Sequence, residues 1–152
     1  MKVTKDNILK EIERRKQIFG HYYDNFEKHL SDNKISKASE FLWGAIHCLI
    51  YAISITYNKP ISDHGGIIRF SKFLSEEENE PLIYKWVKVS EKLHINFYHS
   101  TFDKEDLEIY REDADKLIGK LGKLLEKRIE VVKREFLEDI EEDGVDFSNS
   151  LI

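Results

Sequence analysis

The chain has 152 residues, enough for one domain with a sizeable core, and 41% of them are hydrophobic, which excludes an intrinsically disordered chain. Its formal net charge of −5 argues against a general phosphate binder, which presents a basic excess, but leaves room for a local basic patch. The single cysteine, Cys48, excludes an intramolecular disulfide and a cysteine-rich zinc site. The amino terminus has no apolar signal core, so we expect a cytoplasmic protein.

Two helices are predicted first, over about residues 4–30 and 34–57, because apolar residues recur there with a period near 3.6. The short polar connection between them favours an antiparallel hairpin. The second helix includes 17 uncharged residues, 41–57, near the lower limit for a membrane span. Polar residues dilute this run, so we predict a central helix covered by the others. Its His47 is interpreted first as a hydrogen-bonded core histidine, and second as a ligand or base.

A shorter helix is expected after Ser62 or Asp63, either of which can cap it. His64 and Arg69 could help to bind an anion at its start, although surface residues without a specific role are the preferred interpretation. Pro81 suits the first turn of the next helix, which runs to about residue 99. Steps of three and four along this helix predict one buried apolar stripe, consisting of Leu82, Trp86, Val89, Leu93 and Phe97.

Polar residues able to do chemistry lie beside this stripe. His94 and Tyr98 fall on one shoulder, and Asn96 and His99 fall on the other. His94 and His99 are roughly 140° apart around the helix, too far for one small ligand within a single chain. They could converge across a symmetric dimer.

The last helix is predicted over about residues 103–143 and contains no proline. It would be roughly 50 Å long, whereas a compact domain of this size has a radius of gyration of only about 15 Å. Either it breaks between Gly119 and Gly122, or its far end leaves the domain and buries its apolar stripe on a partner, for which a second copy is favoured. We predict a single domain over residues 1–142 and a frayed acidic tail over 143–152.

Two short runs carry a resemblance to a known family: Leu93-His94-Ile95-Asn96-Phe97-Tyr98, and the helix that contains Phe41-Leu42-Trp43-Gly44-Ala45. With the short helix after His64 and the long last helix, they make residues 36–125 resemble the PaREP1 family of archaeal proteins. That family is similar to the HEPN superfamily of small helical bundles. The resemblance implies an all-α, up-and-down bundle of about five helices with a long C-terminal helix, and a tendency to form homodimers.

The resemblance also implies two functions. Many HEPN proteins are RNases with an arginine followed four to six positions later by a histidine, and others pair with a nucleotidyltransferase. Here His99 matches the motif histidine and Asn96 its polar residue, but His94 stands where the arginine would be, so the motif arginine is missing. An arginine can clamp a phosphate with two parallel hydrogen bonds, which a histidine cannot do.

The preferred hypothesis is a non-catalytic or accessory dimer that binds a nucleotide, an RNA or a protein partner such as a nucleotidyltransferase. The alternative is a metal-independent RNase with a composite site at the dimer interface, in which His99 is the base and His94 replaces the arginine. Neither hypothesis needs a cofactor or a metal. A third interpretation, a metal site that uses His94, His99 and nearby carboxylates, has no His-x-x-x-His spacing to support it. The candidate catalytic residues are His94, Asn96, Tyr98 and His99, and the candidate ligand-binding residues are His47, His64 and Arg69.

Overall fold

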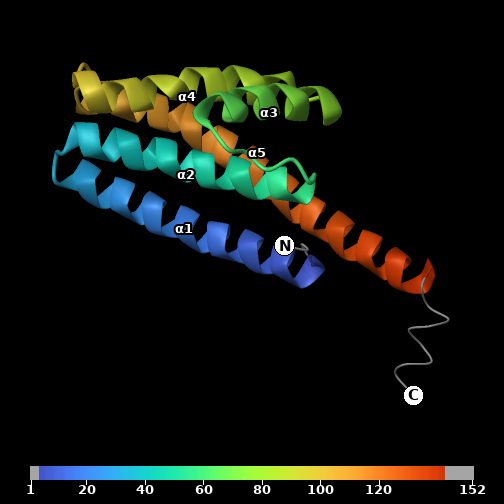
Figure 1. Cartoon of the computed structure of the whole chain (residues 1–152). Coiled ribbons are helices and arrows are strands. Elements are labelled where there is room, and N and C mark those ends of the chain that lie inside the picture. The colour runs from blue at the N-terminus through green and yellow to red at the C-terminus, as the bar shows by residue number, and fades with distance from the viewer. Residues whose placement is uncertain (1–3, 143–152) are drawn as a thin grey trace.

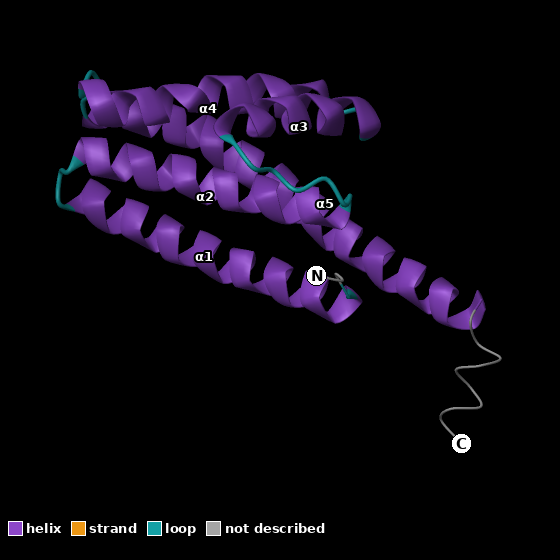
Figure 2. Ribbon diagram, in the orientation of Figure 1, coloured by secondary structure: helices purple, strands orange, loops and turns teal. Residues whose placement is uncertain are grey.

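The computed structural model describes residues 4–142, which form five helices and, within that range, no strand (Figure 2). In chain order the helices are α1 (Lys5–Ser31), α2 (Ile35–Thr56), α3 (His64–Glu77), α4 (Pro81–His99) and α5 (Lys104–Glu142). The predicted all-α bundle with a long C-terminal helix is therefore confirmed. The predicted single domain stays a prediction, and its acidic tail, residues 143–152, lies outside the described residues.

The first two helices form the predicted antiparallel hairpin (Figure 1). The side chain of Thr4 caps α1 by accepting a hydrogen bond from the backbone N–H of Asn7 at 3.2 Å. At the other end, Asn33 adopts a left-handed conformation with φ of 57°, which reverses the chain within a few residues.

α2 is the centre of the bundle, because it contacts all four other helices. Among the described helices it alone is long and apolar enough to cross a membrane, and 67% of the window that meets this test is buried inside the bundle. Its predicted apolar face is buried along its whole length: Ala38, Leu42, Ala45, Leu49 and Ile53. The prediction of a central helix covered on several sides is confirmed.

α3 and α4 form a second hairpin on the opposite side of α2 from α1 (Figure 1). Asp63 caps α3 through a 2.6 Å hydrogen bond from the N–H of Gly66. Pro81 occupies the first turn of α4, as predicted.

The buried stripe of α4 differs from the predicted one. The residues that face the core are Ile83, Val87, Ser90, Leu93 and Asn96. Of the predicted stripe, Leu82 and Phe97 are 40% and 39% exposed, so their predicted burial is wrong. The reason is that α4 packs against α2, α3 and α5 together. Those three neighbours turn the buried face toward Ile83 and Val87 and leave the ends of the expected stripe in solvent.

α5 is one continuous helix of 39 residues that runs diagonally across the bundle and past the start of α1 (Figure 1). It does not break at Gly119 or Gly122, where a Cβ atom would meet nothing within 4 Å. Its apolar stripe is covered by the chain itself as far as Val132, which is 8% exposed. The ion pair between Lys16 and Glu126, 2.8 Å long, ties this part of α5 to α1.

Candidate functional site

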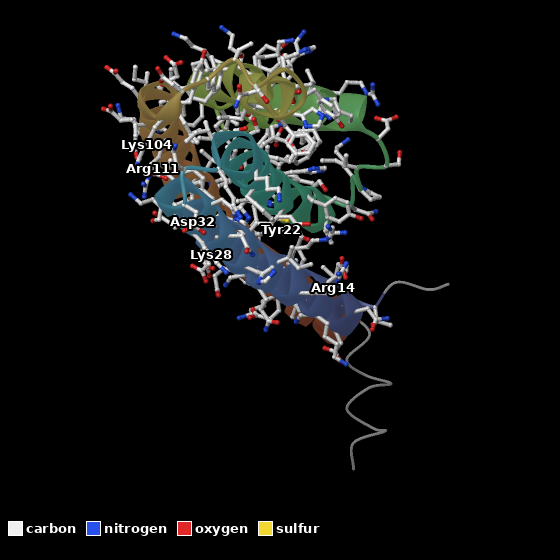
Figure 3. All side chains as sticks on the ribbon, turned by 90° about the vertical axis from the view of Figure 1, so that its left-hand side faces the viewer. Arg14, Tyr22, Lys28, Asp32, Lys104 and Arg111 are labelled. Carbon is white, nitrogen blue, oxygen red and sulfur yellow. The ribbon has the colours of Figure 1, made fainter. Side chains whose placement is uncertain are left out.

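A groove of about 520 Å³ lies on the surface between α1 and α2. Its lining comes from two helices: Arg14, Arg15, Ile18 and Tyr22 from α1, and Glu40, Phe41, Trp43, Gly44, His47 and Cys48 from α2. Arg14 and Tyr22 project from the same side of α1 in Figure 3. At Gly44 a Cβ atom would lie 3.0 Å from the ring of Tyr22, so the absence of a side chain at this position lets the ring pack close to α2.

The two arginines of the groove share one carboxylate. Arg14 donates two hydrogen bonds to Glu11, of 3.0 and 2.8 Å, and Arg15 donates one of 3.0 Å. These bonds, those from Arg14 above all, hold the pKa of the Glu11 carboxyl below its ordinary value. The guanidinium of Arg15 also lies 3.7 Å from the centre of the Tyr51 ring, a cation–π contact that fixes its orientation.

Beside the groove, Trp43, His64 and His94 form an aromatic stack that we call the histidine–tryptophan cluster. The ring centres of Trp43 and His94 are 4.4 Å apart, and those of Trp43 and His64 are 5.4 Å apart, with the rings within 23° of parallel. The two histidine rings are 5.6 Å apart. The three residues come from α2, α3 and α4, so the cluster forms only when these helices pack together.

Each histidine of the cluster is held by a glutamate from a neighbouring helix. His94 contacts Glu40 through Nδ1, at 2.9 Å, and His64 contacts Glu91 through Nε2, at 2.8 Å. The second oxygen of Glu91, Oε1, is buried and has no hydrogen-bond partner among the described residues. A carboxylate on one ring nitrogen fixes the orientation of a histidine and leaves the other nitrogen for a ligand or a proton.

His47 joins the cluster to the groove. Its ring lies edge-on to Trp43, with 5.1 Å between the centres, and it also lines the groove. Burial, assisted by the positive charge of Arg15, lowers the pKa of His47 to about 4. The ring is therefore neutral at pH 7 and can both donate and accept a hydrogen bond.

The structure brings three of the predicted site residues, His47, His64 and His94, together around Trp43. Tyr98 touches this group edge-on, with 5.2 Å between its ring centre and that of His94, and it is 68% exposed.

The other predicted site residues lie apart. His99 is exposed at the end of α4. Arg69 is exposed and forms a 3.1 Å ion pair with Asp63, the residue that caps α3.

Asn96 has a structural position instead. Its side chain is fully buried, donates a 3.1 Å hydrogen bond to Ser39, and accepts a 2.7 Å hydrogen bond from the N–H of Phe102. These hydrogen bonds hold the connection between α4 and α5 against α2. In this connection Ser100 adopts a left-handed conformation with φ of 50°. The contacts of Asn96 hold α4 in place, and its predicted part in the site stays a prediction.

Sequence reasoning missed six residues of the site. They are Arg14, Arg15 and Tyr22 on α1, Glu40 and Trp43 on α2, and Glu91 on α4. Two spacings could have indicated part of this set. Glu40, Trp43 and His47 share one face of a helix at i, i+3 and i+7, and Glu91 precedes His94 by three positions. Among the side chains that the structure describes, no group of three or more histidine, cysteine, aspartate or glutamate residues is arranged to hold a metal ion.

The described residues form a small all-α bundle with a groove of about 520 Å³ beside its central helix. Residues 14–118 match the model of the archaeal PaREP1/PaREP8 family, and the chain belongs to that family. The stated resemblance to PaREP1 is thereby confirmed, whereas the wider resemblance to HEPN proteins stays a prediction.

The chain is also similar to a protein from Sulfolobus solfataricus whose crystal structure is known. The TM-score is 0.63 at 23% identity, over 71% of this chain and 96% of that one, which supports a shared fold. A search among curated proteins gave no match.

Proposed function

We propose that this protein is a non-catalytic binding module that holds a phosphorylated nucleoside, free or as part of an RNA strand, in the groove between α1 and α2. One observation carries the proposal: an arginine pair and aromatic rings line the same groove of about 520 Å³. That size lies within the usual range of about 300–1,000 Å³ for small-molecule sites.

The two ends of a nucleotide match the two kinds of side chain in the groove. The planar guanidinium groups of Arg14 and Arg15 suit the oxygens of a phosphate, which they can bind through paired hydrogen bonds. Tyr22 and Trp43 offer ring surface on which a base can stack, and such stacking contributes about 1–3 kcal/mol per base. The net charge of −5 is compatible with this local arrangement, because only one short basic patch is needed.

The α2 side of the groove adds groups that can recognise the edge of a base. His47 is neutral because burial holds its pKa at about 4, so it can act as donor or acceptor. Glu40 accepts hydrogen bonds, and its contact with His94 holds it in position. Both are polar groups held in place by packing, as a specific site requires.

Isothermal titration with AMP, adenosine and a short single-stranded RNA tests this function. The parent is expected to bind AMP and the RNA, whereas the double variant Arg14→Gln/Arg15→Gln should bind them about tenfold more weakly or worse. The matched control is Lys88→Gln/Lys92→Gln, which removes the same charge from exposed positions on α4. Equal binding by both double variants, or no binding by the parent, would refute the proposal and favour a protein partner.

The histidine–tryptophan cluster favours a second candidate function, metal-independent RNA cleavage. Its supporting observation is that His64 and His94, 5.6 Å apart, are each oriented by a glutamate. One histidine would take the proton of a 2′-hydroxyl as that oxygen bonds to phosphorus, and the other would give a proton to the departing 5′-oxygen. In the sequence-based version His99 is the base and two copies of the chain share the site, and both ideas remain part of this proposal.

Incubation of chelator-treated protein with a mixed RNA pool separates the two functions. The variants are His94→Ala and His99→Ala, and light scattering first establishes that they have the oligomeric state of the parent. Cleavage that is lost with His94→Ala but kept in His99→Ala would support the cluster, and cleavage that is lost in both variants would support the shared site, where His94 replaces the motif arginine. Intact RNA in all three samples would leave the binding module as the function.

A further inference from the structure

Building on the proposed function, we infer that Glu11 is an internal competitor for the ligand's phosphate and that it lowers the affinity of the groove for every phosphate that binds the arginine pair. The carboxylate of Glu11 occupies the arginine pair when no ligand is bound. A phosphate that takes the same donors must displace it, and the cost of that displacement is the same whatever the charge of the phosphate.

The geometry at Glu11 is that of an anion held in a guanidinium fork. Nε and Nη2 of Arg14 reach the two oxygens of Glu11 separately, at 3.0 and 2.8 Å, and Nε of Arg15 reaches one of them at 3.0 Å. A planar guanidinium presents this same pair of donors to a phosphate. Both arginines line the groove, so a phosphate that bound them through the same Nε and Nη2 donors would compete with Glu11.

The contact is suited to exchange because it is weakly held. Arg14 and Glu11 are three residues apart on α1, and their side chains are 55% and 35% exposed. Exposed ion pairs at this spacing contribute little to stability, so separating them leaves the helix intact. Arg15 keeps its position when Glu11 is released, because its guanidinium lies against the Tyr51 ring.

The charge of the ligand decides how strongly the arginine pair attracts it, with or without Glu11. A phosphodiester inside an RNA strand carries one negative charge, the same as the carboxylate that it would replace. A terminal phosphate monoester carries about −1.5 to −2 at pH 7 and has three acceptor oxygens. The groove should therefore prefer a free nucleoside monophosphate, or the phosphorylated end of a strand, over internal phosphates.

The test compares two RNA oligonucleotides of one sequence, with a 5′-phosphate and with a 5′-hydroxyl. Binding to the parent, Glu11→Gln and Glu13→Gln is measured by fluorescence anisotropy. Glu13 is the matched control, because its substitution removes the same charge from an exposed position on roughly the opposite side of α1.

The parent is expected to prefer the phosphorylated strand. In Glu11→Gln both strands should bind roughly threefold more tightly than they bind the parent, whereas in Glu13→Gln both affinities should stay close to those of the parent. Circular dichroism checks that all three proteins have the same helix content. Equal affinities in Glu11→Gln and Glu13→Gln, with binding intact, would overturn the role of Glu11 alone. Failure of the parent to bind either strand or AMP would overturn the proposed function together with this inference.

Discussion

The two sides of α2 differ in burial although both belong to one apolar-looking stretch of sequence. Leu42 and Ala45 on one side are fully buried, whereas Glu40, Trp43 and His47 on the other are only partly buried and line the groove. The buried side makes the helix rigid, and that rigidity fixes the positions of the polar and aromatic groups on the open side. Stability and binding should therefore respond to substitutions on different sides of the same helix.

Substitution of a residue on the buried side of α2 should give the largest loss of stability. Leu42→Ala removes a side chain that is 0% exposed and leaves a cavity between packed helices. We expect a loss of about 2–5 kcal/mol in the free energy of unfolding, measured by denaturant titration. AMP should still bind to the fraction that stays folded with unchanged affinity. A loss below about 1 kcal/mol would mean that this side tolerates rearrangement, and the contrast between the two sides would weaken.

The second largest loss of stability should come from breaking the contact between α2 and the end of α4, where the α4–α5 connection begins. Asn96→Ala removes the hydrogen bonds to Ser39 and Phe102 and leaves the partly buried N–H of Phe102 without its partner. We expect a loss of about 1–3 kcal/mol in unfolding free energy, with AMP affinity unchanged in the folded protein. Thr101→Val is the control, because the hydrogen bond it removes is a long one of 3.4 Å. Loss of AMP binding without loss of stability would instead place Asn96 in the site.

On the open side of α2, His47 should make the stability of the protein depend on pH. The pKa of His47 is about 4 in the folded protein, against an ordinary value of 6.5. Between these values the unfolded chain binds a proton that the folded chain does not, so stability should fall as the pH drops from about 6.5 toward 4.

In His47→Gln this part of the fall should be absent, a difference from the parent of about 1–2 kcal/mol at pH 4.5 once solvent screening is included. Unfolding midpoints at pH 7 and 4.5 measure it. Identical pH dependence in parent and variant would show that His47 protonates without cost.

The smallest change in stability should come from the floor of the groove. Gly44→Ala gains helix propensity but sets a Cβ atom 3.0 Å from the Tyr22 ring, so the net change should stay within about 1 kcal/mol while the displaced ring weakens AMP binding. Gly20→Ala on α1 is the control, because a Cβ atom there meets nothing within 4 Å. It should stabilise the protein without affecting binding. If Gly44→Ala binds AMP as well as the parent, Tyr22 does not contact the ligand.

The helices could be predicted from the sequence because their signals are local. Thr4, Asp63 and Pro81 begin helices where their chemistry predicts, and the apolar period of each segment sets its helical state. The orientation of α4 about its own axis, which decides the face that is buried, could not be predicted. Its pattern is apolar over a broad arc, and only packing against three other helices selects Ile83 and Val87 as its buried face.

The candidate site was predictable only in part. Histidines stand out in a sequence because they are few and chemically versatile, and three of the six gather around Trp43. The glutamates that orient them could not be assigned. Glu40 and His94 are 54 positions apart and meet only through the packing of α2 on α4, which no single helical wheel contains.

The late position of α5 in the chain has a consequence for how the protein is made. α2 needs α5 to cover one of its sides, and the hydrogen bond from Arg128 to the carbonyl of Thr56, 3.0 Å long, marks where the two meet. Ribosomes add roughly 5–20 residues each second, so α5 follows α2 only after several seconds. During that interval the most apolar helix of the nascent chain has one side uncovered. Aggregation and misdirected insertion into a membrane therefore compete with folding mainly before α5 emerges.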